Sequence, residues 1–126
     1  MKLQELCQFD ISRLHFRIWD AELEVMVYVP PHEVSKLKGE KHIMQCTGLA
    51  GDNQELIYEG DLVSFADDGG SQRMNIALIH WDNDGAAFEV AKLDDQMKID
   101  TYESEGIRGS AEMKVIGNVF EGVRKK

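Results

Sequence analysis

The stretch LIYEGDLVSF, Leu56 to Phe65, says most about how this chain folds. Apolar residues lead into Glu59-Gly60-Asp61, and apolar residues follow. Two carboxylates two positions apart on a strand would face the same side, close enough to share a metal ion or a proton. Gly60 interrupts that geometry, because glycine readily takes turn and bulge conformations. We therefore expect a corner at which Asp61 accepts backbone N–H groups and the residues after it enter the core.

Short alternating segments on both sides of this corner predict further strands. Residues 15–20 (HFRIWD) and 25–29 (VMVYV) have the alternation of a β-hairpin, which the prolines at 30 and 31 end because proline cannot donate to a strand ladder. Residues 1–12 favour a helical turn or two, and residues 32–41 favour a loop or a short helix. Further strands are predicted at 42–47, 61–66, 74–81, 86–93 and 113–120.

One of these strand pairs has a strong turn signal between its members. The sequence DNDG, ending at Gly85, separates residues 74–81 from 86–93. Asn, Asp and Gly accept the positive φ angles of tight turns, so a hairpin is expected with Gly85 as a structural turn residue. Many short strands with frequent turns predict a mainly β fold, a small barrel or sandwich, and 126 residues suffice for one such domain.

The charge is strongly acidic, with 14 basic against 23 acidic residues and a net charge of −9. Eight acidic residues but only two lysines lie between Asp82 and Glu105. This surface repels nucleic-acid phosphates, and it either attracts a basic protein or only keeps the chain soluble. A cytoplasmic protein with reduced Cys7 and Cys46 is expected, because the chain has neither a signal-peptide pattern nor an apolar run of membrane length.

The order of the motifs HFRIWD, IMQCTGL, IYEGDLV, IHWD and VIGNVFE resembles the YopX family of phage and prophage proteins, over residues 14–122. The resemblance implies an N-terminal β-hairpin, within residues 1–41, packed on an SH3-like barrel body over residues 42–126. It implies the cytoplasm of a bacterial host, and it carries over no catalytic or binding residue. One departure is Asn53-Gln54, where the family has Asn-Gly, so a tight type I′ turn is less expected there.

Four polar residues are the candidates for a site. Glu59, Asp61, His80 and Asp82 are the best available ligands if the protein is an acidic metal-dependent enzyme. Against that interpretation, Gly60 marks a structural turn, and the segment around Asp82 fails as a calcium loop because Ala91 stands where the bidentate carboxylate is required. No nucleophile or phosphate-loop pattern occurs. We therefore expect no catalytic residue, no metal and no cofactor.

The remaining interpretation is a non-enzymatic protein-binding or regulatory module. Its partner is expected to be a protein, for example a basic one that meets the acidic segment from Asp82 to Glu105, or another copy of the chain joined through unpaired strand edges. Nucleic-acid binding through Arg13, Arg17 and the basic end at residues 124–126 is a further alternative, against which the net charge argues. Most aromatic residues are expected in the core.

Overall fold

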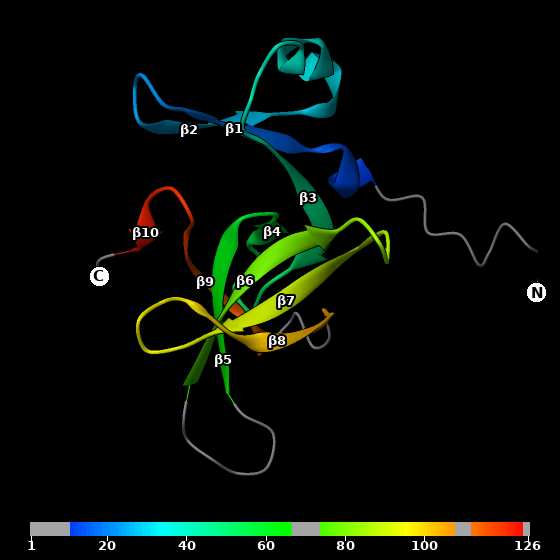
Figure 1. The fold of residues 1–126 in the computed structure, drawn as a ribbon. Helices are drawn as coiled ribbons and strands as arrows, with labels where there is room; N and C mark the ends of the chain where they lie inside the picture. The colour runs from blue at the N-terminus through cyan, green and yellow to red at the C-terminus, as the bar shows by residue number, and fades with distance from the viewer. Residues whose placement is uncertain (1–10, 67–73, 108–111, 125–126) are drawn as a thin grey trace, which may run out of the picture.

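The computed structural model describes residues 11–66, 74–107 and 112–124, and the protein is mainly β (Figure 1). One sheet has the strand order β2-β1-β3-β4, and a larger curled sheet has the order β10-β9-β5-β6-β7-β8. The first contains β1 (Phe16–Asp20), β2 (Val25–Val29), β3 (Ile43–Ala50) and β4 (Leu56–Tyr58). The second contains β5 (Asp61–Ala66), β6 (Met74–Asp82), β7 (Ala87–Leu93), β8 (Ile99–Gly106), β9 (Lys114–Asn118) and β10 (Gly122–Val123).

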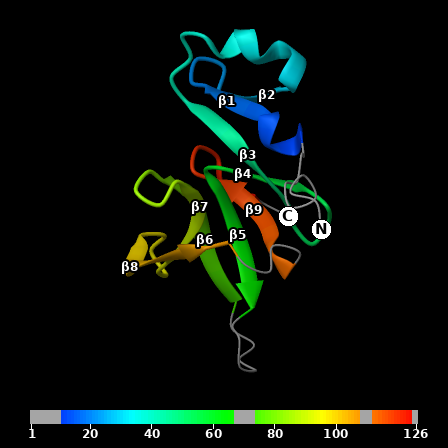
Figure 2. The same ribbon diagram turned by 90° about the vertical axis from the view of Figure 1, so that its right-hand side faces the viewer.

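The predicted hairpin and small β-barrel or roll are confirmed. β1 and β2 pair in unbroken antiparallel register, from Phe16 opposite Val29 to Asp20 opposite Val25. In Figures 1 and 2 this hairpin lies at one end of the molecule, and β3 runs from it into the curled body. β3 pairs with β1 and also with β4, so one strand links the hairpin to the residues that follow. The proposed division of the chain at residue 42 stays a prediction.

Two 3₁₀ segments accompany the strands in the part of the chain that the structure describes. Residues Pro31–Leu37 form the short helical segment η3, in the region where the sequence predicts a loop or a short helix. Pro31 suits the first turn of this segment, because proline lacks the N–H that would be unpaired there. Residues Ile11–Leu14 form η2, and most of the helical turn predicted over residues 1–12 lies outside the described residues. No helix in the described ranges is long and apolar enough to cross a membrane.

Three strands were not predicted. β4 and β10 are only three and two residues long, too short for an alternation pattern. β8 runs through the acidic segment and pairs with β7 at the edge of its sheet, for example with Val90 opposite Glu105. Charged residues are common on edge strands, because one side of such a strand meets water. The acidic composition therefore hid this strand.

The core lies on the inner face of the curled sheet. It contains Ile57, Val63, Ala77, Ile79, Val90, Met113 and Val115, with Phe65 and Ile107 packed against it. The alternation in β5 and β6 places Val63, Ala77 and Ile79 on one face. Each fully buried aliphatic side chain contributes about 1.5–3 kcal/mol.

The expectation that the aromatic residues lie in this core holds for Tyr58, which is buried, and is wrong for Tyr28, Trp81 and Phe120. Trp81 instead meets Phe88 across the β6–β7 pair, with ring centroids 5.0 Å apart.

Candidate functional site

The corner at Glu59-Gly60-Asp61 joins several strands through its main chain. The Glu59 N–H donates to the carbonyl of Gln45 in β3 at 2.9 Å, and the Gly60 N–H donates to Ile79 in β6 at 2.8 Å. The Gly60 carbonyl accepts from Val119 at 2.9 Å. Gly60 has φ +86°, which favours glycine, and a Cβ added there would lie 3.0 Å from the Met44 sulfur. The corner therefore requires glycine.

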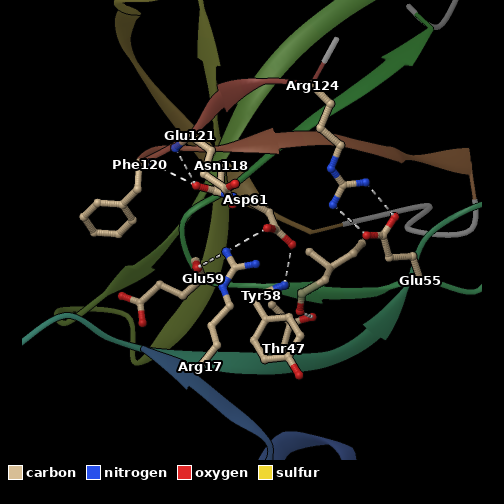
Figure 3. Close-up of polar contacts among 11 residues, drawn as sticks. Arg17, Thr47, Glu55, Tyr58, Glu59, Asp61, Asn118, Phe120, Glu121 and Arg124 are labelled. Atoms are coloured by element: carbon tan, nitrogen blue, oxygen red, sulfur yellow. Dashed lines mark hydrogen bonds and ion pairs between the residues drawn. The ribbon is translucent and has the colours of Figure 1, made fainter. Parts of the chain in front are cut away.

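A buried ion pair closes this corner (Figure 3). Arg17 Nη2 of β1 lies 2.7 Å from Asp61 Oδ1, and the two side chains are 3% and 2% exposed. Arg17 Nη2 also donates to the Glu59 carbonyl at 3.0 Å, and Asp61 Oδ2 accepts the Tyr58 N–H at 2.7 Å. The guanidinium carbon lies 4.8 Å from the centroid of the Tyr58 ring, a cation–π contact. The hairpin is thus tied to the body by charge, hydrogen bonds and ring packing.

Burial sets the protonation behaviour of this cluster. Burial raises the pKa of the Asp61 carboxyl, and the Arg17 guanidinium and the Tyr58 N–H offset only part of that rise. Burial also raises the pKa of the Tyr58 phenol to about 12, so the phenol is neutral at physiological pH. Within the described chain, Arg17 Nε has no hydrogen-bond partner, and Asp61 Oδ1 has the ion-pair contact without good hydrogen-bond geometry. An orphaned buried polar atom costs about 1–3 kcal/mol.

The other two candidate ligands lie on β6. His80 is half-buried and stands opposite Glu89 of β7. Asp82 ends β6, and its carboxylate accepts the N–H groups of Asp84 at 3.3 Å and of Gly85 at 3.0 Å, which closes the β6–β7 turn. Gly60 bonds to Ile79, the residue before His80, so the corner and β6 are neighbours. The Asp61 carboxylate, however, is engaged with Arg17, and that of Asp82 with its own turn.

Metal-ligating side chains are not gathered at this place. Among residues 11–66, 74–107 and 112–124, no group of three or more His, Cys, Asp or Glu side chains is arranged to hold a metal ion. Cys46 is fully buried, whereas His42 is exposed and its ring centroid lies 5.3 Å from that of Phe120. The metal-dependent enzyme remains a hypothesis without a ligand cluster to support it.

The turn at Gly85 differs in detail from the expectation. The positive φ of this turn falls on Ala86, at 50°, and not on Gly85. Gly85 is needed for a different reason, because a Cβ there would lie 2.7 Å from Asp82 Oδ2. The carboxylate that caps the turn occupies the space that a side chain would take.

The acidic residues from Asp82 to Glu105 are spread from the end of β6 through β7 to β8. Asp82 ends β6 and Asp84 lies in the turn before β7, whereas Asp94 and Asp95 lie between β7 and β8. The Asp94 carboxylate accepts the N–H groups of Gln96 and Lys98 at 2.8 and 2.9 Å. Two of these carboxylates, Asp82 and Asp94, therefore stabilise turns, besides contributing to the charge of the surface.

An aromatic stack forms a second link between the hairpin and the body. The rings of Trp19 and Phe120 are stacked, with centroids 5.2 Å apart and an interplanar angle of 9°. Phe120 follows β9 in a turn held by Asn118, whose Oδ1 accepts the Phe120 and Glu121 N–H groups at 3.0 and 2.9 Å. Asn118 itself pairs with Asp61 across β5 and β9. The stack and the ion pair thus belong to one junction.

The exposed side of the hairpin was missed by sequence reasoning. β2 is an outer strand of its sheet, and Val25 and Val27 are 43% and 40% exposed. Val27 stands opposite Ile18, and Ile18 stands opposite Ile43, which is 39% exposed, so an apolar row crosses three strands. The row faces away from the side of Arg17, which points toward the body. The one available signal was the absence of any charged residue from Val25 to Val29.

Comparison with known proteins identifies a family. The family model described as YopX protein matches residues 30–124, well over half of the chain. No curated protein gives a significant match.

Proposed function

The chain belongs to the YopX family, and we propose that it is a non-enzymatic protein-binding module whose contact surface is the hairpin strand β2 with the apolar row beside it. The single observation that supports this is the unpaired outer edge of β2. Val25 and Val27 are exposed there, and no strand of the described residues pairs with the outer side of β2.

The physical argument starts from the backbone. An outer strand presents unpaired N–H and C=O groups along one side, and these groups pair readily with an extended segment of another chain. Proteins usually protect such a strand with charges, proline or a bulge. Val25–Val29 contains neither a charge nor proline, and its register with β1 is unbroken. A strand left in this state is suited to a binding role.

The apolar row adds area to the edge. Val27 and Ile43 each remain about two-fifths exposed, on either side of the buried Ile18. Covering apolar surface contributes about 25 cal/mol for each Å² removed from water. In this proposal the backbone of β2 provides the pairing, and the valine and isoleucine side chains provide the hydrophobic contact. The family resemblance to phage and prophage proteins makes the bacterial cytoplasm the compartment in which the partner is sought.

The test is a pull-down from bacterial lysate with three immobilised proteins: wild type, Val27→Lys and Val34→Lys. Val34 is the matched control, because it is 43% exposed on η3 and is not part of β2. A protein retained by wild type and Val34→Lys but reduced at least about tenfold by Val27→Lys supports the proposal, since a charge opposes pairing at an edge. Retention that Val27→Lys does not change contradicts it.

Salt separates this surface from the acidic segment. Contact through the carboxylates between Asp82 and Glu105 would weaken as ionic strength rises, because salt screens exposed charges. Contact through the uncharged β2 persists or strengthens. A retained protein that is eluted by salt and is indifferent to Val27→Lys would assign the binding to the acidic segment instead.

A further inference from the structure

The edge of β2 matches a second copy of itself, and we propose that this chain forms a two-fold symmetric dimer by antiparallel pairing of β2 with β2 of another copy. The inference rests on the proposed function of this surface and adds the identity of a partner. Figure 1 shows β2 at the end of the molecule away from the curled sheet, with η3 at the same end.

The first argument compares the sheet edges. The two described sheets end in β2, β4, β10 and β8. β4 has three residues and β10 has two, so neither offers a useful length for pairing. β8 has the sequence IDTYESEG, and its acidic residues would oppose pairing with a copy of itself. Of these four edges, β2 is the one that is long enough and has no protecting charge.

The second argument is the overall charge. Two chains of net charge −9 repel each other, so contact is favoured where neither copy brings carboxylates to the interface. Val25–Val29 meets this condition. Glu24 precedes the strand and Pro30 follows it, so pairing centred on Val27 places each Glu24 opposite Pro30 of the other copy. The two glutamates then lie at opposite ends of the interface.

The third argument is the symmetry of the strand itself. The sequence VMVYV has valine at every second position in both directions. Centred on Val27, antiparallel pairing sets Val27 against Val27 and Val25 against Val29 of the second copy. On the other face it sets Met26 against Tyr28. A two-fold interface requires that the same patch complement itself, and the apolar row from Ile43 through Ile18 to Val27 then continues across the axis.

The test uses a charge pair at the two-fold axis. Val27→Lys and Val27→Glu are each made in the full chain, and mass in solution is measured by light scattering and sedimentation velocity. Wild type is expected to be a dimer at about 100 µM. Each variant alone should dimerise at least about tenfold more weakly, because two like charges meet at position 27. Mixing the two variants in equal amounts should restore a dimer, since Lys then faces Glu.

Controls keep the result interpretable. Val34→Lys changes the charge equally and lies off the strand, so it should remain dimeric. Circular dichroism and thermal unfolding check that each variant folds, and the exposure of Val27 allows a lysine there to reach water. Raising salt from about 0.15 M to about 0.5 M should strengthen the wild-type dimer, because salt screens the repulsion between two negatively charged chains. The same change should weaken the dimer of the two variants, because salt also screens the attraction between Lys and Glu at position 27.

Three results would overturn the dimer. These are a monomeric wild type at about 100 µM, equal loss of mass in Val27→Lys and Val34→Lys, and a mixture of the two Val27 variants that stays monomeric. A monomeric wild type that still retains a lysate protein dependent on Val27 would leave the proposed function intact. A wild-type dimer that retains no lysate protein would contradict the proposed binding of other proteins and would leave the proposed self-association intact.

Discussion

Arg17 in the N-terminal hairpin and Asp61 at the first position of β5 form an ion pair that is almost completely buried, with Nη2 and Oδ1 2.7 Å apart. The pair explains why a carboxylate stands next to Gly60. Asp61 neutralises the arginine that the hairpin inserts against the body, and it also accepts the Tyr58 N–H that the bend leaves unpaired. The two carboxylates of the corner therefore differ in role, because Glu59 contributes to the corner through its main chain.

Removing one member of this pair should be more damaging than removing both. Arg17→Met leaves a buried carboxylate and Asp61→Asn leaves a buried guanidinium, so each should lower the free energy of unfolding by about 3–5 kcal/mol. The double variant should recover much of the loss, because no unpaired charge remains and the new amide at position 61 still offers an oxygen to the Tyr58 N–H. Urea unfolding of the four proteins gives the coupling energy. Strictly additive losses would show that the pair does not act as a unit.

The glycine at the corner should tolerate no side chain. Gly60→Ala combines a positive φ with a Cβ 3.0 Å from the Met44 sulfur, and it should destabilise the protein by roughly 2–4 kcal/mol. Gly39→Ala is the matched control, because Gly39 has φ +85° and nothing within 4 Å of the added Cβ. Its cost should be nearer 1 kcal/mol, from the backbone alone.

Thermal unfolding measures this difference, at about 4 °C of Tm for each kcal/mol. Glu59→Gln is the companion variant at the same corner, and it should leave Tm almost unchanged. Equal losses in the two glycine variants would mean that packing against Met44 contributes nothing. A large loss of binding in Glu59→Gln, with normal stability, would restore the corner as a functional site.

The β3–β4 turn contains strain that glycine would relieve. Gln54 has φ +64°, in the left-handed region that L-residues enter at a cost of roughly 1–2 kcal/mol. Gln54→Gly should raise the free energy of unfolding by about 0.5–1 kcal/mol, since the greater freedom of glycine in the unfolded chain offsets part of the relief. Denaturant unfolding measures the gain. Gln54→Ala should show none of it, and a gain in both variants would point to the loss of the glutamine side chain instead.

The ion pair between Glu55 and Arg124 should make a small contribution that depends on pH. The hydrogen bond from Arg124 holds the pKa of Glu55 below its ordinary value of 4.5, although partial burial opposes the shift. A lowered pKa in the folded state means stability that is present above pH 4.5 and is lost as pH falls through the folded pKa. Because the side chains of Glu55 and Arg124 are 32% and 52% exposed, the ion pair should contribute about 0.2–1 kcal/mol to the free energy of unfolding.

The measurement is the difference in unfolding free energy between wild type and Arg124→Gln from about pH 7 to about pH 3. The difference should be largest at neutral pH and should vanish at the acidic end. Asp61 contributes with the opposite pH dependence, because its pKa is raised in the folded state. Its contribution to stability is present below its ordinary pKa of 3.8 and is lost as pH rises through the folded pKa. Because both proteins contain Asp61, this contribution cancels in the difference. A difference that grows toward acid would contradict the assignment to Glu55.

Divalent metals should not stabilise the protein. The carboxylate of Asp61 is engaged with Arg17 and that of Asp82 caps a turn, which leaves His80 and Glu59 without the two strongest candidate ligands beside them. Thermal unfolding with Mg²⁺, Mn²⁺, Zn²⁺ or Ca²⁺ should therefore give the same Tm as without metal, since a ligand that binds the native state must raise its stability. A rise in Tm that is lost in Asp82→Asn would support the metal-dependent enzyme instead.

Strand positions were predictable wherever alternation and turn chemistry agreed. Residues 74–81 with 86–93 show both signals, residues 15–20 with 25–29 show the alternation, and both pairs form hairpins. The acidic strand β8 and the very short β4 and β10 show neither signal. Each of them pairs with a neighbouring strand of its sheet, and this pairing leaves no local pattern in the sequence. The candidate site was predictable only in part: the paired carboxylates were visible in the sequence, but the arginine that engages one of them was not.

Alternation, glycine and motif order are local properties of a chain. The sequence alone was therefore enough to predict a mainly β protein, a turn at Gly60 and membership among YopX-like proteins. The contact of Arg17 with Asp61 and the exposure of Val25 and Val27 become visible in the folded structure alone. Both depend on which strand lies beside which and on which face is covered. Those contacts join distant parts of the chain, so no local pattern of residues contains them.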